Sequence, residues 1–187
     1  TCEAGYIIVM CKGSAENHQT SRKSARIWLA NFAATGFYSG YWPWASGTAG
    51  SLAAAVLAYF LLNYVPVTAS LSGGICLAAA FTLLGVYSAN IVCDAGLYGP
   101  ENKDPKQIVI DEFAGYFVTI IGLGGGIPEL AAAFIAFRIF DIIKPPPARQ
   151  MEQLPRGYGI VLDDIFAGAY AAAGARVLLA GVDFFLR

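Results

Sequence analysis

Long uninterrupted apolar stretches dominate the middle of the chain and predict helices that can enter a membrane. Residues 27–93 contain no Asp, Glu, Lys, Arg or His. Within them, apolar runs over residues 52–65 and 71–93 flank a turn that contains Pro66. A helix needs about 20 apolar residues to cross a bilayer. The second run reaches this length, and the first does so with its flanking residues, so the pattern predicts a helical hairpin whose ends return to the same side.

The next apolar stretch, residues 113–137, is interrupted in its middle by Gly122, by glycines 124–126 and by Pro128. The piece before this break spans about ten residues, or about 15 Å of helix, which is too short to cross a bilayer. We expect a shallow or re-entrant hairpin here. A final helix is expected to open at Asp164 and to run toward Phe185.

The predicted fold class is therefore all-α, a compact bundle of about six helices that includes membrane-embedded or interfacial helical hairpins. Residues 21–187 are expected to form a single helical domain, and residues 1–20 stay an unassigned N-terminal segment. Basic residues precede the first apolar region, which predicts that this end is cytoplasmic and that the later charged windows share that face. They are Lys12, Arg22, Lys23 and Arg26.

Composition supports a membrane protein and excludes several kinds of site. Hydrophobic residues make up 57% of the 187 residues and charged residues only 13%, about half the usual charged share. The net charge of −1 supplies no basic surface, so nucleic acid is not an expected partner. Four cysteines form no C-x-x-C pair, and His18 is the single histidine. A histidine-based metal site and a Ser-His-Asp triad are therefore not expected.

Two near-copies of one acidic phrase are the main chemical signal. Residues 108–115 contain Asp111-Glu112, residues 160–168 contain Asp163-Asp164, and both pairs stand in apolar surroundings. Adjacent carboxylates repel one another, and apolar surroundings make their ionised forms costlier. A divalent cation is the simplest way to neutralise them. For either pair alone, favourable charge near a helix N-terminus or an N-cap stays an alternative.

The flanking sequence predicts where these pairs lie on their helices. A helix is expected to begin at Asp104 or Pro105, which would place the first pair in its early turns. The second pair follows residues 157–159, a Gly-Tyr-Gly segment that we interpret as a flexible turn.

A third polar element contains Arg138, Asp141 and Lys144, whose spacing of three places them on one broad face of a helix. The prolines at 145–147 are expected to end that helix. Asp141 is placed to join a metal cluster, and Lys144 and Arg149 can hold a phosphate or an anionic lipid headgroup. An intrahelical ion pair at a membrane boundary is the alternative.

Small residues at 46–51 begin the first apolar helix, and their exposed N–H groups can attract an anion. Ordinary capping by Ser46 or Thr48 explains them equally well. Trp42 and Trp44 just before them are typical of an interfacial aromatic anchor.

Taken together, four phrases resemble the phosphatidylglycerophosphatase A family, and the resemblance covers roughly residues 27–185. The phrases are SGTAGSLAAA at 46–55, DPKQIVIDEFAG at 104–115, FRIFDIIKPPPAR at 137–149 and RGYGIVLDDIFAG at 156–168. Three positions depart from the family pattern. Ser46 replaces a usual proline, Pro146 replaces a bulky residue between two prolines, and Arg156-Gly157 replaces a common Gly-Gly. None of these departures removes a carboxylate.

The resemblance implies a helical enzyme, integral to the bacterial inner membrane in some members, that converts phosphatidylglycerophosphate to phosphatidylglycerol and needs Mg²⁺. An anionic phospholipid and the lipid bilayer are then the expected partners, and the active site is expected on the cytoplasmic face. The resemblance also implies an acidic site with Lys144 and Thr48 nearby. Its acids are Asp111, Glu112, Asp141, Asp163 and Asp164.

The expected chemistry is metal-assisted hydrolysis, because all-oxygen ligands suit Mg²⁺, with Mn²⁺ as the alternative. One or two ions would bind the phosphate and lower the pKa of an attacking water. A free carboxylate would act as general base. Lys144, with Arg138 or Arg149, would balance the charge of the transition state. Attack by water is the default expectation, and an aspartyl-phosphate intermediate stays open.

Three other interpretations remain at this point. A CDP-alcohol phosphotransferase also clusters aspartates at a membrane face, but its Asp-Gly-x-x-Ala-Arg opening is absent. A cation transporter would use intramembrane carboxylates as an ion pathway. The acids here stand at the ends of apolar runs rather than in their middles, which favours an interfacial enzyme. The third is a soluble helical domain of the same family type.

Overall fold

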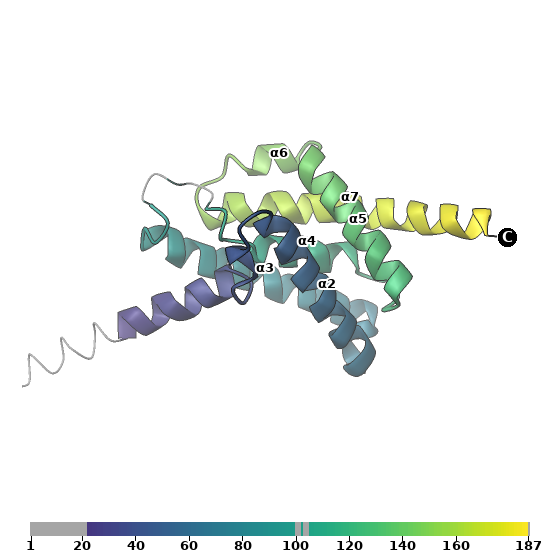
Figure 1. The fold of residues 1–187 in the computed structure, drawn as a ribbon, viewed down its shortest axis with the longest axis horizontal. Helices are drawn as coiled ribbons and strands as arrows, with labels where there is room; N and C mark the ends of the chain where they lie inside the picture. Colours follow the sequence, from purple (N-terminus) through teal and green to yellow (C-terminus); the bar gives the residue numbers. More distant parts are fainter. Residues whose placement is uncertain (1–21, 100–101, 103–104, 187) are drawn as a thin grey trace, which may run out of the picture.

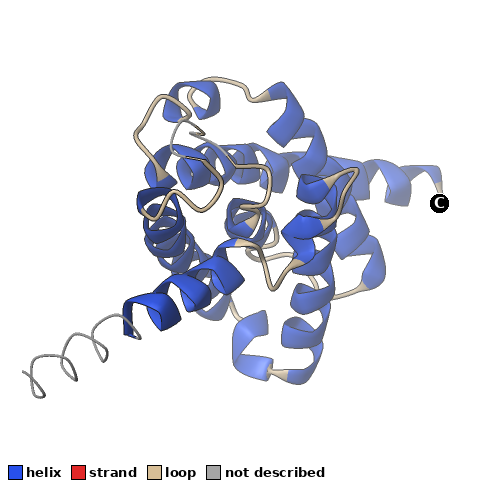
Figure 2. Ribbon diagram, turned by 60° about the vertical axis from the view of Figure 1, so that its left-hand side comes forward, coloured by secondary structure: helices blue, strands red, loops and turns tan. Residues whose placement is uncertain are grey.

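The computed structural model describes residues 22–99, 102 and 105–186, which contain only helices and loops (Figures 1 and 2). The segment 1–20 and His18 lie outside the described residues. A helix over residues 22–34 comes first. It is followed by η1 (Ser39–Tyr41), α2 (Ser46–Tyr64), η2 (Pro66–Ala69), α3 (Leu71–Asp94), α4 (Ile110–Thr119), α5 (Ile127–Ile143), α6 (Ala148–Met151) and α7 (Gly157–Phe185). The predicted all-α fold is confirmed, as are the hairpin of two long helices around Pro66 and the glycine-rich break between residues 119 and 127.

The short helix α4 forms the centre of the bundle. It packs against α2, α3, α5 and α7, and nearly all of its residues are buried. Phe117 stacks on Phe81 of α3 with ring centroids 4.5 Å apart, and the Tyr116 hydroxyl donates a hydrogen bond to the Leu130 carbonyl of α5. Large buried aromatic rings contribute strongly to core stability. The first half of the stretch expected to be a shallow hairpin thus lies inside the bundle. The acids at the start of α4 are fixed there by the packing of this helix against its four neighbours.

Glycines allow α4 and α7 to cross in close contact. A Cβ atom on Gly115 of α4 would lie 2.6 Å from the Asp164 carbonyl oxygen of α7. A Cβ on Gly168 of α7 would overlap the Gly115 carbonyl. Small residues let helix backbones approach in this way. Each glycine follows an acid, Asp111 or Asp164, by four residues, or about one helical turn. The repeated phrase therefore brings the two acidic pairs to the same level of the bundle.

Three helices are long and apolar enough to cross a membrane: α2 with 19 residues, α3 with 24 and α7 with 29. Most residues of their apolar windows are partly or fully exposed, since 22% of the window is buried in α2 and α7 and 28% in α3. Leu83 and Val177 are examples, with 72% and 71% of their surface exposed. Exposed apolar surface of this extent is typical of contact with lipid or with another protein. The structure thus agrees with the predicted membrane-embedded helices.

Two predicted helix starts are wrong. The helix that carries Asp111 begins at Ile110, not at Asp104 or Pro105, and Pro105 lies in a buried loop. The last helix begins at Gly157, so Asp164 lies in its second turn instead of opening it.

The segment interpreted as a flexible turn is thus the first turn of α7. A Cβ on Gly157 would lie 2.8 Å from the Val86 carbonyl oxygen of α3 and 3.0 Å from the Ala89 Cβ. Gly157 allows close packing between helices. The local sequence had instead suggested that it breaks a helix.

The crossing of α4 and α7 can be tested with paired glycine substitutions on α7. Gly168→Ala inserts a methyl group against the Gly115 backbone and is expected to lower the free energy of unfolding by about 1–3 kcal/mol. Gly181→Ala is the control, because nothing lies within 4 Å of a Cβ there, and it is expected to be neutral or stabilising by up to about 1 kcal/mol. Thermal unfolding in detergent measures both. Equal stability of the two variants would contradict a tight crossing at Gly168.

Candidate active site

All five predicted acids line one cavity of about 190 Å³. The start of α4 supplies two of them, the end of α5 one, and the second turn of α7 two. They are Asp111, Glu112, Asp141, Asp163 and Asp164. Ser46, Gly47, Lys106 and Lys144 complete much of the polar wall. The five acids, which are as much as 53 positions apart in sequence, thus meet in one small space, as the repeated phrase predicted.

Arg138 links two of these acids. Its Nη1 donates hydrogen bonds to both carboxylate oxygens of Glu112, at 2.8 and 2.7 Å, and pairs with Asp141 Oδ2 at 2.8 Å. The Ser51 hydroxyl of α2 donates to Glu112 Oε2 at 2.5 Å. Gly47 makes room for this arrangement, because a Cβ there would overlap Glu112 Oε1. The intrahelical ion pair expected as an alternative is present between Arg138 and Asp141. The same arginine also connects α5 to α4 through Glu112.

Lys144 is held by two other carboxylates. Its Nζ donates to Asp163 Oδ2 at 2.6 Å and to Glu152 Oε1 at 2.7 Å. The lysine immediately follows α5 and has a left-handed backbone with φ of 45°, which turns the chain toward the prolines. The other oxygen of Asp163, Oδ1, is buried and has no hydrogen-bond partner. Buried polar atoms normally have a partner, so this oxygen is available to a ligand.

Burial controls the electrostatics of this cavity. Glu112 is 7% exposed, Asp163 4% and Asp164 2%. Burial raises the pKa of Glu112 to about 7, with a further rise from Asp141, while Arg138 and Ser51 act in the opposite direction. Burial alone would lower the pKa of Lys144, but its hydrogen bonds to Asp163 and Glu152 outweigh that effect and raise it. Lys144 therefore remains a cation beside Asp163.

The donor set fits a hard divalent cation, although it is not a closed cage. In the described part of the chain, no three Asp, Glu, His or Cys side chains are already grouped so that they could hold a metal ion. Mg²⁺ does not need such a group, because it usually keeps several waters and binds through one or two carboxylates plus substrate phosphates. The carboxylate oxygens on the wall and the unpartnered Asp163 Oδ1 suit such an ion.

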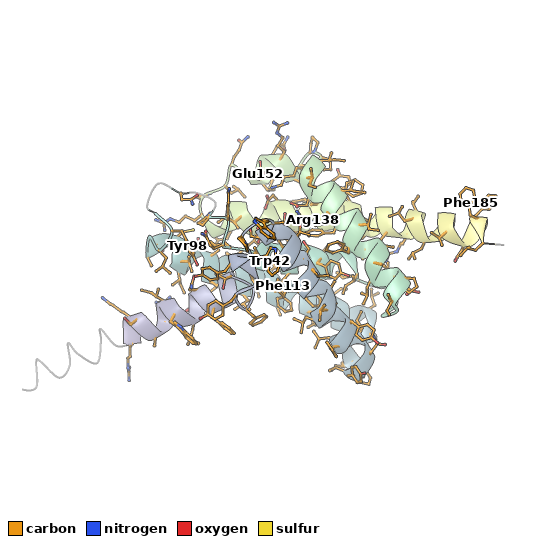
Figure 3. All side chains as sticks on the ribbon, in the orientation of Figure 1. Trp42, Tyr98, Phe113, Arg138, Glu152 and Phe185 are labelled. Atoms are coloured by element: carbon orange, nitrogen blue, oxygen red, sulfur yellow. The ribbon has the colours of Figure 1, made fainter. Side chains whose placement is uncertain are left out.

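The predicted substrate-binding residues are not all at this cavity. Thr48 is exposed in the first turn of α2 and lines a neighbouring cavity of about 460 Å³ together with Trp42, Lys106 and Arg138. Figure 3 shows Arg138 and Trp42 near the middle of the molecule, far from Phe185 at the end of α7. Arg149 is exposed on α6 and lines neither cavity. Its predicted role has no support from the geometry.

Sequence reasoning missed Ser51, Lys106 and Glu152. Ser51 lies 61 residues before Glu112, and no local pattern connects the two. Glu152 follows Lys144 by eight residues across the proline segment, so helical spacing does not apply to the pair. Lys106 stands two residues before the first acidic phrase, and a basic residue so near an acidic pair was the one signal available.

Comparison with known proteins identifies the family. A sequence model of the phosphatidylglycerophosphatase A family matches residues 32–179, a range that includes all five acids. The chain belongs to the phosphatidylglycerophosphatase A family. The resemblance expected from the four phrases is thus confirmed, and membership makes the chain an enzyme, a phosphatase.

Three relatives support this membership in the phosphatidylglycerophosphatase A family. A phosphatidylglycerophosphatase A of Haemophilus influenzae is 41% identical over 74% of this chain and 81% of its own. The Escherichia coli protein of the same name is 35% identical over 74% of this chain and 77% of its own. A Bacteroides thetaiotaomicron protein named as a phosphatidylinositol-3-phosphatase is 37% identical over 73% of this chain and 85% of its own. No solved structure matches the chain significantly.

The hydrogen bond from Ser51 to Glu112 gives a test of the site's geometry. Ser51→Ala removes a bond to a buried charged group, which is worth about 1.5–3 kcal/mol, and kcat/KM for phosphate release is expected to fall about tenfold or more. Ser88→Ala is the control, because the Ser88 hydroxyl is equally buried but bonds only the Gly85 carbonyl of its own helix. If both variants lose activity equally, Ser51 has no special role in holding Glu112.

Proposed function

We propose that this protein hydrolyses the terminal phosphomonoester of phosphatidylglycerophosphate, with Mg²⁺ as cofactor and Mn²⁺ as an alternative, to give phosphatidylglycerol. The observation that carries the proposal is the single cavity lined by five carboxylates from three helices, in a chain with membrane-length apolar helices. Two relatives, 41% and 35% identical, bear the name of this activity. The bacterial inner membrane, with the site on its cytoplasmic face, is the proposed location.

The five acids of the cavity are the residues proposed to hold the cation, directly or through its waters, and Asp163 offers the buried Oδ1 for this role. Glu112 and Asp141 also bond Arg138, so they are suited to orient the ligand sphere. When bound, Mg²⁺ supplies positive charge to the phosphate oxygens and lowers the pKa of a water.

The chain's own residues supply the remaining steps. A carboxylate that does not bind the cation takes a proton from the attacking water. The water oxygen bonds to phosphorus as the ester bond breaks, and the glycerol oxygen leaves with the proton that the carboxylate took from the water. Lys144 is fixed on the cavity wall by Asp163 and Glu152, so its charge can stabilise the phosphate oxygens as negative charge develops.

A second lipid deserves comparison within the same chemistry. The relative named as a phosphatidylinositol-3-phosphatase is 37% identical to this chain. Phosphatidylinositol 3-phosphate also carries a phosphomonoester on an anionic diacyl lipid. Both substrates therefore belong in one assay, and a higher kcat/KM for the inositol lipid would move the proposal to that headgroup.

The central experiment measures phosphate release by the purified full chain in detergent micelles containing phosphatidylglycerophosphate. Release is expected with Mg²⁺, to be lost with EDTA, and to return when Mg²⁺ or Mn²⁺ is added back. Asp111→Asn and Asp163→Asn are each expected to lower kcat by about 100-fold or more, since each removes a carboxylate from the cavity. Asp183→Asn is the control, because Asp183 is exposed near the end of α7.

Several outcomes would contradict the proposal. Phosphate release that is insensitive to EDTA would remove the cation from the mechanism. Full activity of either site variant would remove that acid from the site. Turnover that requires a cytidine nucleotide would favour the phosphotransferase, and metal flux into proteoliposomes without phosphate release would favour the transporter.

A further inference from the structure

An apolar groove runs along the outside of the bundle between α2 and α5. The two helices pack against each other and run side by side toward one edge of the molecule in Figure 1. The groove has a volume of about 410 Å³ and no charged residue in its lining. It is lined by Leu52, Ala55, Val56, Tyr59, Ile127, Leu130, Ala131, Phe134 and Ile135.

One end of this groove lies at the polar site. The first lining residue of α2, Leu52, directly follows Ser51, and the last of α5, Ile135, precedes Arg138 by three residues. Arg138 Nη1 donates a hydrogen bond to the Ser51 hydroxyl at 3.3 Å, and both residues bond Glu112 on the wall of the acidic cavity. One end of the groove therefore lies within about one helical turn of two residues that bond Glu112 of that cavity.

The groove extends over most of the depth of one leaflet of a bilayer. Its lining on α5 runs from Ile127 to Ile135, which is about 12 Å of helix, and Arg138 lies three residues beyond it. The hydrocarbon core of a bilayer is about 30 Å thick, so one leaflet is about 15 Å deep. An elongated apolar molecule with its polar end near Arg138 would thus lie in the groove over most of that depth.

The surface of the groove favours a thin, flexible, apolar occupant. Its rims are exposed, with 56% of Leu52 and 70% of Ile127 accessible, so the groove is open along the outer face of the bundle. Small side chains, including Ala55 and Ala131, contribute to its lining. Within a bilayer, van der Waals packing rather than removal of surface from water drives such association, and a narrow apolar groove provides many close contacts. An acyl chain meets these requirements and, on a lipid phosphomonoester, is attached to a headgroup that must reach the neighbouring acidic cavity.

We propose that the groove between α2 and α5 binds an acyl chain of the lipid phosphomonoester and thereby positions its phosphate at the acidic cavity. This inference rests on the proposed function, which it extends by naming where the lipid portion of the substrate lies. The groove then distinguishes substrates by chain length, because a short chain gains little from the surface near Ala131.

The test fills the groove without touching the polar site. Ala131→Trp places a large side chain on an exposed alanine of the groove, and Ala79→Trp makes the same change on an exposed alanine of α3 that does not line it. Phosphate release is measured with a long-chain and a short-chain lipid phosphomonoester. Ala131→Trp is expected to raise KM for the long-chain lipid about tenfold with kcat nearly unchanged, the signature of lost ground-state binding. The short-chain lipid and the Ala79→Trp variant are expected to show no such change.

A binding measurement separates this inference from the proposed function. A long-chain phosphomonoester lipid with a photoreactive group in its acyl chain is expected to label α2 and α5 of the Asp163→Asn variant, and the label is expected to decrease in Asp163→Asn/Ala131→Trp. Absence of phosphate release from every lipid by the unmodified chain would overturn the proposed function alone. The labelling would still test the groove.

Four results would overturn the groove proposal. The first is an equal effect of Ala131→Trp and Ala79→Trp, and the second is an equal effect on long and short chains. The third is equal labelling by photoreactive phosphatidylcholine, which would show that bulk lipid fills the groove. The fourth is crosslinking between protein copies through α2 and α5, which would show a second copy there. If Ala131→Trp does not fold, Ala55→Leu narrows the same groove and carries the same expectation.

Discussion

The close crossing of α4 and α7 determines where the functional groups of this molecule lie. Gly115 and Gly168 allow each backbone to approach the other, and a side chain on either would meet a backbone carbonyl of the opposite helix. Asp111 and Asp164 each precede the glycine of their helix by four residues, or about one turn. The same short phrase thus supplies both the contact between the helices and the carboxylates beside it. A change in the helix contact would therefore also displace the carboxylates.

This arrangement has an electrostatic cost, because buried like charges repel and lose their hydration. Two cations at the end of α5 offset part of it: Arg138 holds Glu112 and Asp141, and Lys144 holds Asp163. The position of Asp111 and Glu112 in the first turn of α4 offsets a further part, since the helix dipole favours negative charge there. The acidic pair at residues 111–112 can therefore both stabilise the start of α4 and belong to a cation site. Functional sites commonly retain such destabilising charge.

The sequence predicted the helices and the proximity of the acids because both signals are local. Apolar runs predicted the long helices, and the repeated phrase predicted that Asp111 and Asp163 would meet. The failures concern information that only tertiary contacts carry. Glycine at residue 157 was interpreted as a turn because the carbonyl of Val86, against which it packs, belongs to a distant part of the chain. Arg149 was grouped with Lys144, but it stands on α6 after the prolines and lines neither cavity, so its role stays a prediction.

The length of α4 explains how a membrane-sized bundle can hold a polar cavity. A ten-residue helix spans about 15 Å, roughly half of a bilayer's hydrocarbon core. Because α2, α3, α5 and α7 surround it, its apolar side chains are buried in protein, while its first turn carries the acids to the level of the α5 end. The glycine-rich break after residue 119 ends this central helix within the bundle. The chain then returns in α5, whose far end brings Arg138 and Lys144 back to the level of the acids.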